Sequence, residues 1–276
     1  MSVFNGENHL FKAIKSILNQ TYENFEFIII NDGSTDKSKE IIESYHDERI
    51  VLIDQKNKGL TPSLNLGIKV ARGKYIARMD ADDISHHLRL EKQIIYLKEN
   101  HLDLVWAKAK FIDESGKLIC NKFQPNLKNT LKFLHKFIYI VHPATLFKKS
   151  AILDSGLYDE EFKSGQDGDL WRRMKSKGYS FGLIDEYLLD YRITEISISA
   201  QNNNYSKNIN YRNAKICLQN FQYRKFIKFF RGINNFNLSL ILIFRFIINE
   251  YFILLIRYLL PNNYNKVHKY NEFKTN

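Results

Sequence analysis

Apolar positions in the first hundred residues alternate between short continuous runs and helically spaced sets. Residues 25–30 form a continuous apolar run, which is typical of a buried strand. Leu10, Ile14 and Ile17 instead recur at helical spacing. The predicted strands cover 25–30, 49–53 and 75–79, and the predicted helices cover 7–20, a segment capped by Ser34, a segment from Thr61-Pro62 to Gly73, and a segment spanning Leu90 to Leu97. This alternation indicates βαβ units and a parallel sheet.

The next hundred residues continue the α/β pattern and complete one domain. Strands are predicted within 104–120, broken by a turn at 114–117. A helix is predicted in part of 126–137. Another covers 167–176 and is closed by Gly178, and two strands follow at 180–184 and 187–192. The expected organisation is an α/β domain over 1–200, with a mostly parallel sheet flanked by helices, and a separate segment over 201–276.

Positive charge is concentrated in that last segment. The chain carries a formal net charge of +11, and twelve basic side chains oppose only Glu250 and Glu272 beyond residue 200. Residues 238–256 are apolar, but Arg245 and Glu250 interrupt them, which favours an amphipathic helix over a membrane span. Residues 226–260 are therefore expected to contact an anionic membrane surface, and the alternative is a helix packed on the body or on a second subunit.

The remaining composition bears on compartment and on excluded functions. Cys120 and Cys217 fit no ligand spacing, as expected of free thiols in a reducing compartment. The N-terminus lacks the basic and apolar regions of a signal peptide, so a cytoplasmic location is expected, peripheral on the inner face of the cell membrane. No Gly-x-Gly-x-x-Gly follows the first strand, which argues against a nicotinamide-dependent enzyme. Aromatic and basic residues form no known RNA-binding motif, so no nucleic-acid partner is expected.

Acidic residues follow two of the predicted strands. Asp32 comes after one, and Asp80, Asp82 and Asp83 come after another. Ligands in open parallel sheets bind beyond the carboxyl ends of the strands, and clustered carboxylates suit a hard divalent cation. The alternative is that these are solvated turn or helix-cap acids. A third pair, Asp167 and Asp169, opens a predicted helix, where an acid either stabilises the helix dipole or serves as a general base.

Several motifs in one order resemble glycosyltransferase family 2. They are Asn5-Gly6-Glu7, Gln20-Thr21-Tyr22, Ile30-Asn31-Asp32-Gly33-Ser34-Thr35-Asp36, Ala77-Arg78-Met79-Asp80-Ala81-Asp82-Asp83, Gly156-Leu157-Tyr158-Asp159-Glu160-Glu161-Phe162 and Asp167-Gly168-Asp169-Leu170-Trp171. The resemblance covers about residues 1–199. It implies a GT-A fold, a nucleotide-sugar donor and inversion at the anomeric carbon. By family habit alone, the donor is expected to be a UDP-sugar. The resemblance also implies a glycan or lipid-linked glycan acceptor and a role in bacterial surface polysaccharide or lipopolysaccharide synthesis.

The same resemblance assigns roles to individual residues. Phe4, Asn5, Glu7 and Asp32 would flank the base and ribose of the donor, with Asp32 bonding the base. Asp80 would lie near the ribose and Asp83 would line the sugar pocket. Asp82 would ligate Mn²⁺ or Mg²⁺ on the diphosphate, and Asp167 would deprotonate the acceptor.

Three features depart from the family pattern. Gln166 stands where relatives usually carry Glu, and Thr194 stands where they often carry His. Relatives also carry several apolar residues before the equivalent of Ser2-Val3-Phe4, so the first strand is expected to be a stub. Met1 would then be an internal methionine or the start of a truncated gene, the alternative being a natively short strand. These departures keep a second function open, a catalytically impaired member that acts as a scaffold or binding module.

Overall fold

The computed structural model describes residues 1–122, 124–132, 134, 139–162 and 164–194. The chain separates into two units, Met1–Phe221 and Gln222–Asn276, and all described residues belong to the first. The predicted boundary at residue 200 and the predicted basic segment lie outside the described residues. Within the described ranges, no helix has both the length and the apolar composition that crossing a membrane requires.

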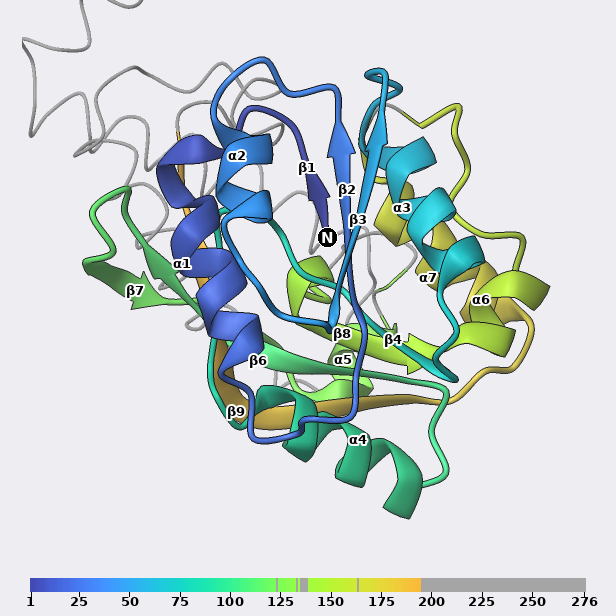
Figure 1. The fold of residues 1–276 in the computed structure, drawn as a ribbon. Helices are drawn as coiled ribbons and strands as arrows, with labels where there is room; N and C mark the ends of the chain where they lie inside the picture. The colour runs from blue at the N-terminus through green and yellow to red at the C-terminus, as the bar shows by residue number, and fades with distance from the viewer. Residues whose placement is uncertain (123, 133, 135–138, 163, 195–276) are drawn as a thin grey trace, which may run out of the picture. The chain divides into compact units, whose positions relative to one another are not determined.

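A three-stranded parallel sheet forms the N-terminal part of the fold. It contains β1 (Ser2–Val3), β2 (Phe27–Asp32) and β3 (Ile50–Gln55) in the order β1-β2-β3. The three strands run in the same direction in Figure 1, so their carboxyl ends share one edge of the sheet. The predicted βαβ units and parallel pairing are confirmed in this sheet.

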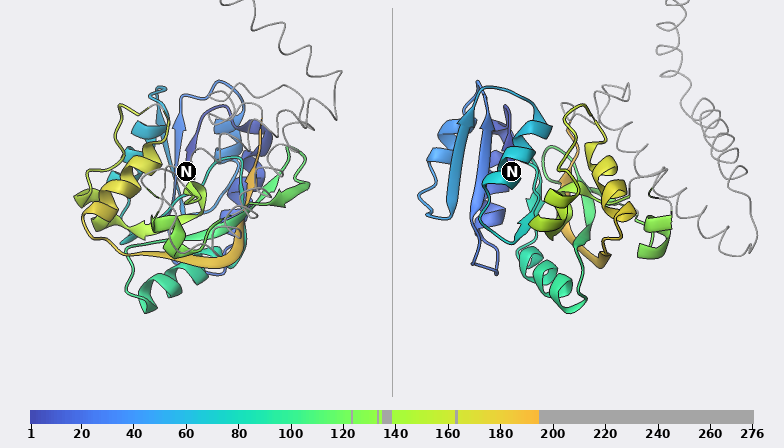
Figure 2. Two further views of the ribbon diagram at one scale, coloured as in Figure 1. Left: turned by 180° about the vertical axis from the view of Figure 1, so that it is seen from behind. Right: turned by 90° about the vertical axis from the view of Figure 1, so that its right-hand side faces the viewer.

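Helices cover both faces of the first sheet (Figures 1 and 2). Successive strand residues point to opposite faces, and β2 is apolar on both. Ile29 packs with Leu10 and Ile14 on one face. On the other face, Ile30 lies next to Gly67, where an added Cβ would be 3.9 Å from the Ile30 side chain. The helices are α1 (Glu7–Leu18) and α2 (Ser38–Glu43) on the first face, and α3 (Leu60–Val70) on the second.

A second, mixed sheet follows, with strand order β4-β8-β6-β9-β5 and β7 paired to β6. Its strands are β4 (Tyr75–Ala77), β5 (Ile84–Ser85), β6 (Leu104–Ile112), β7 (Leu118–Asn121), β8 (Thr145–Lys148) and β9 (Phe181–Arg192). Only β6 and β9 pair in parallel here, and the other pairings are antiparallel. The expectation of parallel pairing therefore fails for most of this sheet, because β7 and β8 pair with β6 as returning strands rather than through right-handed crossovers.

Four helices and one 3-10 turn surround the second sheet. Val105 of β6 packs with Ile94 and Leu97, whereas Trp106, the next residue, packs with Ile152 and Trp171. Both faces of β6 are thus buried under helices. The helical elements are α4 (Arg89–Glu99), α5 (Leu127–Lys132), the 3-10 turn η1 (His142–Ala144), α6 (Lys149–Asp154) and α7 (Gln166–Ser176). The helix predicted in part of 126–137 is confirmed as α5, and the helix predicted over 167–176 is confirmed as α7.

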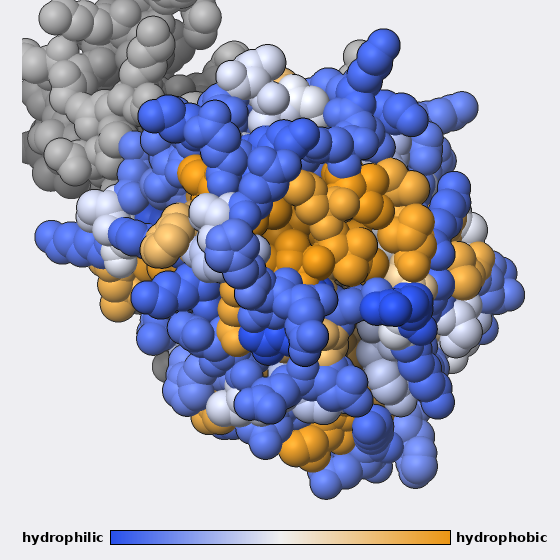
Figure 3. All heavy atoms as spheres, in the orientation of Figure 1, coloured by the Kyte–Doolittle hydropathy of each residue, from blue (hydrophilic) through white to orange (hydrophobic). Residues whose placement is uncertain are grey.

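The first strand is short, as predicted. β1 has two residues, and Met1 extends its ladder by accepting a hydrogen bond from the Ile30 amide. A cavity of about 610 Å³ lies beside Met1, between β2 and β4, and apolar side chains of α3 and α4 also line it. Figure 3 shows apolar side chains gathered on this face around the position of the N-terminus in Figure 1.

Three local predictions were wrong. Ser34 does not cap α2, which begins four residues later at Ser38. Gly73 does not end α3, since the helix stops at Val70, and Gly73 lacks the positive φ of a helix-terminating glycine. The two strands predicted within 180–192 are one strand, β9, whose pairing with β6 shifts register beside Ala107 and Lys108. Asp185 and Glu186, which lie between the two predicted strands, have no partner in the register of β6 and form a bulge within β9.

Asp36 performs the capping that the sequence suggested for Ser34. Its carboxylate accepts hydrogen bonds from the Glu7 amide at the start of α1 and from the Ser38 amide at the start of α2, both at 3.0 Å. Burial alone would raise the pKa of Asp36, but the hydrogen bonds from Ser38 and Glu7 outweigh it and lower the pKa. One side chain thus fixes the starts of two helices beside the carboxyl edge of the first sheet.

We predict that Asp36→Ala lowers the free energy of unfolding by about 1–2 kcal/mol, because two helix-terminal amides lose their acceptor. Urea denaturation at neutral pH measures the change. Asp159→Ala is the matched control, since the Asp159 carboxylate accepts the Glu161 amide within its own turn. The control should change stability by less than about 0.5 kcal/mol. Equal losses in the two variants would show that Asp36 does not join the helices.

Candidate active site

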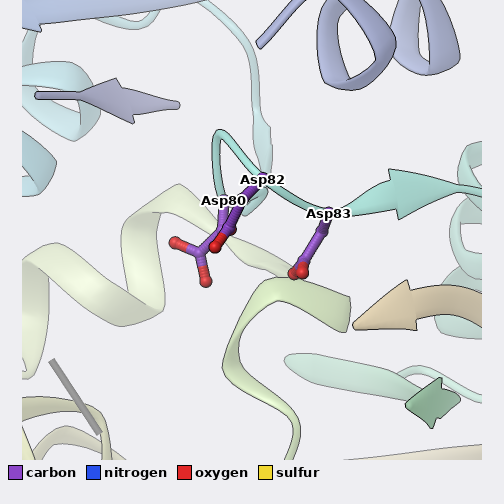
Figure 4. Close-up of side chains that lie close together, drawn as sticks. All are labelled: Asp80, Asp82 and Asp83. Atoms are coloured by element: carbon purple, nitrogen blue, oxygen red, sulfur yellow. The ribbon is translucent and has the colours of Figure 1, made fainter. Parts of the chain in front are cut away.

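The acidic cluster lies on the segment between β4 and β5, residues 78–83, here called the acid loop. β4 and β5 are the two ends of the strand order of the second sheet, so the acid loop connects its opposite edges. Carboxylate oxygens of Asp80, Asp82 and Asp83 all lie within 4.8 Å of one another. Figure 4 shows the three side chains pointing to the same side of the loop. The structure therefore brings together the three acids that the sequence placed after one strand.

Burial and mutual repulsion perturb these acids. Burial and then the neighbouring Asp80 raise the pKa of Asp82 to about 6. The pKa of Asp83 is raised well above its usual value by burial and then by Asp82 and Asp80. Asp83 is 1% exposed, and although its Oδ1 accepts a hydrogen bond from the Arg192 amide at 2.8 Å, its buried Oδ2 has no hydrogen-bond partner. The cluster carries more negative charge than its protein surroundings satisfy.

A divalent cation fits this cluster. Three carboxylates converge within the reach of one ion, and oxygen donors are what Mg²⁺ and Mn²⁺ prefer. The unpartnered Asp83 oxygen is a second, independent sign that a positive group belongs here. The separate roles expected of Asp80 at the ribose, Asp82 at the metal and Asp83 at the sugar remain predictions.

Three buried arginines surround the acid loop, and the sequence reasoning missed all of them. Arg78 forms an ion pair with Asp80. Arg89 on α4 is fully buried, and its guanidinium donates to the Arg78 carbonyl and to Gln93. Burial lowers the pKa of Arg89 to about 10, so the side chain stays protonated at neutral pH. Arg192, the last residue of β9, donates from Nε to the Asp82 carbonyl at 2.7 Å. Each lies between two apolar or aromatic neighbours in the sequence, which was the available signal.

Of the predicted donor-binding residues, Phe4 and Asn5 lie between β1 and α1, and Glu7 is the first residue of α1. Asn5 adopts a positive φ of 51°, and its side-chain oxygen accepts from the Thr35 amide at 2.8 Å. Glu7 accepts from the Lys37 amide at 3.0 Å, and Phe4 is 53% exposed. This segment is next to the acid loop, because a Cβ added at Gly6 would lie 3.8 Å from the Ala81 Cβ.

Asp32 binds the backbone at the start of α3, a structural role that the sequence did not predict. It is buried at the end of β2 and accepts hydrogen bonds from the Lys58 and Gly59 amides, at 2.9 and 2.8 Å, and from the Gln55 side chain at 2.6 Å. Gly59 is the N-cap of α3, so Asp32 ties the end of β2 to the start of that helix. An ionised carboxylate has about four acceptor positions, which leaves one for the predicted contact with the donor base.

Asp167 and the acid loop share charged neighbours. Asp167 lies in the first turn of α7, where burial raises its pKa while Arg78 and Lys122 act in the opposite direction. Arg78 also interacts with the three acids of the loop, and Lys122 also interacts with Asp83. Asp169 differs, since it is bound to Arg173 one turn along the helix, at 2.8 Å. Of the two acids on α7, Asp167 is therefore the one electrostatically linked to the cluster.

Two further groups near Asp167 were given no role by the sequence. The Lys122 ammonium lies 5.4 and 5.3 Å from the ring centroids of Phe111 and Tyr191, and burial lowers its pKa. His142 Nε2 and the Tyr158 hydroxyl form a hydrogen bond of 2.7 Å. Burial and then Arg78 hold the pKa of His142 well below its usual value, so this imidazole is neutral. No motif marks Lys122, which follows β7 directly.

Ligands of open α/β sheets bind beyond the carboxyl ends of the strands. In this chain the acid loop lies beside Gly6, just past the carboxyl end of β1. Comparison with known proteins defines the family. The model for "Glycosyl transferase family 2" matches residues 1–154. The chain belongs to glycosyltransferase family 2.

Curated relatives agree with this assignment. An uncharacterized glycosyltransferase of Methanocaldococcus jannaschii is 42% identical over 195 residues, which are 68% of this chain and 67% of that protein. The O-antigen biosynthesis glycosyltransferase WbnJ of Escherichia coli is 35% identical over 198 residues, 70% of this chain and 78% of that protein. An uncharacterized glycosyltransferase of Rickettsia bellii is 36% identical, and the match spans only 27% of its length.

Solved structures show the same fold. The Staphylococcus aureus TarS 1–349 complex with UDP-GlcNAc matches with a TM-score of 0.62 and 19% identity, over 74% of this chain and 60% of that one. A mannosyltransferase from Pyrobaculum calidifontis, in complex with GDP-Man and Mn²⁺, matches with a TM-score of 0.55 and 14% identity, over 72% of this chain and 57% of that one. The chain thus has the expected GT-A-type α/β fold.

We predict that Mn²⁺ binds the metal-free protein about tenfold more weakly at pH 5 than at pH 7, because ligands must be deprotonated and the raised pKa of Asp82 is about 6. Because the pKa of Asp82 is raised in the folded protein, its protonated form stabilises the metal-free fold at low pH. This contribution to stability is lost as the pH rises through 6. Paramagnetic resonance titration of free Mn²⁺ measures the affinity.

Asp82→Asn should weaken Mn²⁺ binding at pH 7 and reduce this pH dependence, leaving the part that is due to Asp83, whose pKa is also raised. Asp47→Asn is the control, because Asp47 pairs with Arg49 and titrates near pH 2. An affinity that does not change between pH 5 and pH 7 would exclude Asp82 as a ligand.

Proposed function

We propose that this glycosyltransferase moves a sugar from a nucleoside-diphosphate donor to an acceptor hydroxyl with inversion. The observation that carries the proposal is the convergence of the Asp80, Asp82 and Asp83 carboxylates within 4.8 Å, beside Arg78, whose charge also acts on Asp167. A cation-binding cluster and a separate carboxylate then serve one reaction centre. Support also comes from fold neighbours that were solved with UDP-GlcNAc and with GDP-Man and Mn²⁺.

Each residue group has one task in this reaction. The Asp167 carboxylate takes the proton of the acceptor hydroxyl, whose oxygen attacks the anomeric carbon from the side opposite the diphosphate. The new C–O bond forms as the bond to the phosphate oxygen breaks, and the nucleoside diphosphate leaves with the electron pair. Asp80, Asp82 and Asp83 would hold a divalent cation, which when bound neutralises the charge on the diphosphate. The segment 4–7 and Asp32 would contact the base and ribose.

The donor and acceptor are proposed more specifically than the family alone requires. UDP is the proposed carrier, because a fold neighbour was solved with UDP and with UDP-GlcNAc. A glycan or lipid-linked glycan is the proposed acceptor, in bacterial surface polysaccharide or lipopolysaccharide synthesis. The relative named for O-antigen biosynthesis supports this choice.

The cellular location is proposed from the sequence alone. Residues 226–260, which lie outside the described residues, would dock on the anionic inner face of the cell membrane. A lipid-linked acceptor would make this docking useful. Full-length protein that does not bind anionic vesicles at low salt would rule the membrane contact out.

We predict that Asp167→Asn lowers kcat by about 10²–10⁴-fold, the usual contribution of a general base, while donor affinity stays within about twofold. Asp169→Asn is the matched control on the same helix. It should lower stability by loss of the Arg173 pair and leave kcat within about threefold. In the wild type, kcat should rise with pH on the acid side, because Asp167 must lose a proton and burial raises its pKa.

The Asp167→Asn variant also separates the two functions that the sequence left open. An enzyme loses turnover in the variant and retains donor binding. A scaffold that binds without catalysis shows no turnover even in the wild type, and Gln166 and Thr194 are then the first positions to restore to Glu and His.

We predict that one nucleotide-sugar of a panel, tested with Mn²⁺, stabilises the protein by about 2.7 kcal/mol at a hundred times its Kd. A UDP-sugar is expected to give this shift, and the same donor with a chelator should give a smaller one. Thermal denaturation with each donor measures the effect. A larger shift with GDP-sugars would change the proposed carrier, and no shift with any donor would contradict the proposed function.

A further inference from the structure

Arg192 uses a buried charge to hold main chain. The residue is 1% exposed, and its guanidinium donates to three backbone carbonyls: Nε to Asp82 at 2.7 Å, and Nη1 to Asp113 at 2.8 Å and to Glu114 at 3.0 Å. In the part of the chain that the structure describes, this guanidinium forms no ion pair with a carboxylate. Arg192 therefore joins the end of β9, the acid loop and the turn between β6 and β7.

The same residue also contacts the cluster through its backbone. The Arg192 amide donates to Asp83 Oδ1 at 2.8 Å, so both consecutive residues of the acid loop, Asp82 and Asp83, are held from one position. The bond to Asp82 is to its carbonyl, which leaves its carboxylate for another partner. The bond to Asp83 occupies one oxygen and leaves the buried Oδ2 unpartnered.

The hydrogen bonds of Arg192, here called the clamp, oppose the repulsion between the acids. Carboxylates whose oxygens lie within 4.8 Å repel one another, and a short loop could relieve the repulsion by moving them apart. Arg192 prevents this because its planar fork fixes the path of the loop relative to β9 and to the turn at 113–114. Partners of metal ligands commonly set ligand orientation in this way.

We propose that Arg192 is a positioning residue whose clamp on the Asp82 carbonyl and the Asp83 carboxylate sets the spacing of the cation-binding acids. The inference rests on the proposed function, because it concerns the cation that the acid loop would hold. It adds a residue outside the acidic cluster, on a strand more than a hundred residues later, as a determinant of cation affinity.

The test compares Mn²⁺ affinity of metal-free, nucleotide-free full-length protein in the wild type and in Arg192→Lys, by paramagnetic resonance titration. Lysine keeps the charge but cannot reach all three carbonyls. Affinity should fall by about 10–100-fold, as is usual when a partner of metal ligands is lost. Arg192→Gln, whose amide can still donate to one carbonyl, is measured alongside as a milder variant that should fold if the lysine variant does not.

Arg173→Lys is the matched control. Arg173 also donates to two backbone carbonyls, those of Ser155 and Leu157, but touches no residue of the acid loop. Its substitution should lower thermal stability and leave Mn²⁺ affinity unchanged. A merely structural Arg192 would behave like Arg173, and unchanged Mn²⁺ affinity in a folded Arg192 variant overturns the inference. A wild type that binds no Mn²⁺ overturns the cation site of the proposed function as well, so the two failures are distinguishable.

Discussion

The placement of negative charge on the acid loop is the constraint on which the rest of the site depends. Three carboxylates share a small volume at a buried position, and Coulomb repulsion in such surroundings is much stronger than in water. Arg78, Arg89 and Arg192 supply three buried positive charges around the same loop. Arg78 is paired with Asp80, and removal of either partner would leave an uncompensated charge in the interior. Arg89 and Arg192 bind main-chain carbonyls and complete a basic layer around the acidic site.

The topology explains why the basic layer comes from distant parts of the sequence. The acid loop connects β4 and β5, which are opposite ends of the strand order of the second sheet, so it passes close to several elements. Arg78 lies on the loop itself, Arg89 starts α4, and Arg192 ends β9. Because each arginine anchors a different element to the loop, the geometry of the acids is tied to the packing of the whole second sheet. A change in that packing would therefore alter the positions of the acids.

Periodicity predicted the elements well where one face or both faces of a strand are apolar. The first sheet and its helices followed from the apolar run of β2 and the helical spacing of Leu10 and Ile14. The acidic residues could also be predicted, because they follow strands.

The antiparallel pairings of the second sheet could not be predicted, since local pattern does not encode which strands pair. The three carbonyl contacts of Arg192 were hidden for the same reason, because they join residues about 80 to 110 positions apart. The neighbours of Asp167, Arg78 and Lys122, are likewise distant in the sequence. Capping at Ser34 failed because Asp36, two residues later, reaches both helices.

The surroundings of Asp167 set its pKa, which bears on the role of base that is proposed for it. Burial raises its pKa, and a higher pKa makes a stronger base, but a base that is already protonated is useless. Arg78 and Lys122 oppose the effect of burial, while His142, neutral in its hydrogen bond with Tyr158, adds no charge of its own. Arg78 is also the partner of Asp80, so positive charge added at the acid loop acts on the same region as Asp167. Added positive charge favours the ionised form of a nearby carboxylate. In the proposed reaction, a cation bound by the acid loop would therefore favour the ionised form of Asp167, and cation binding would be linked to proton transfer through electrostatics.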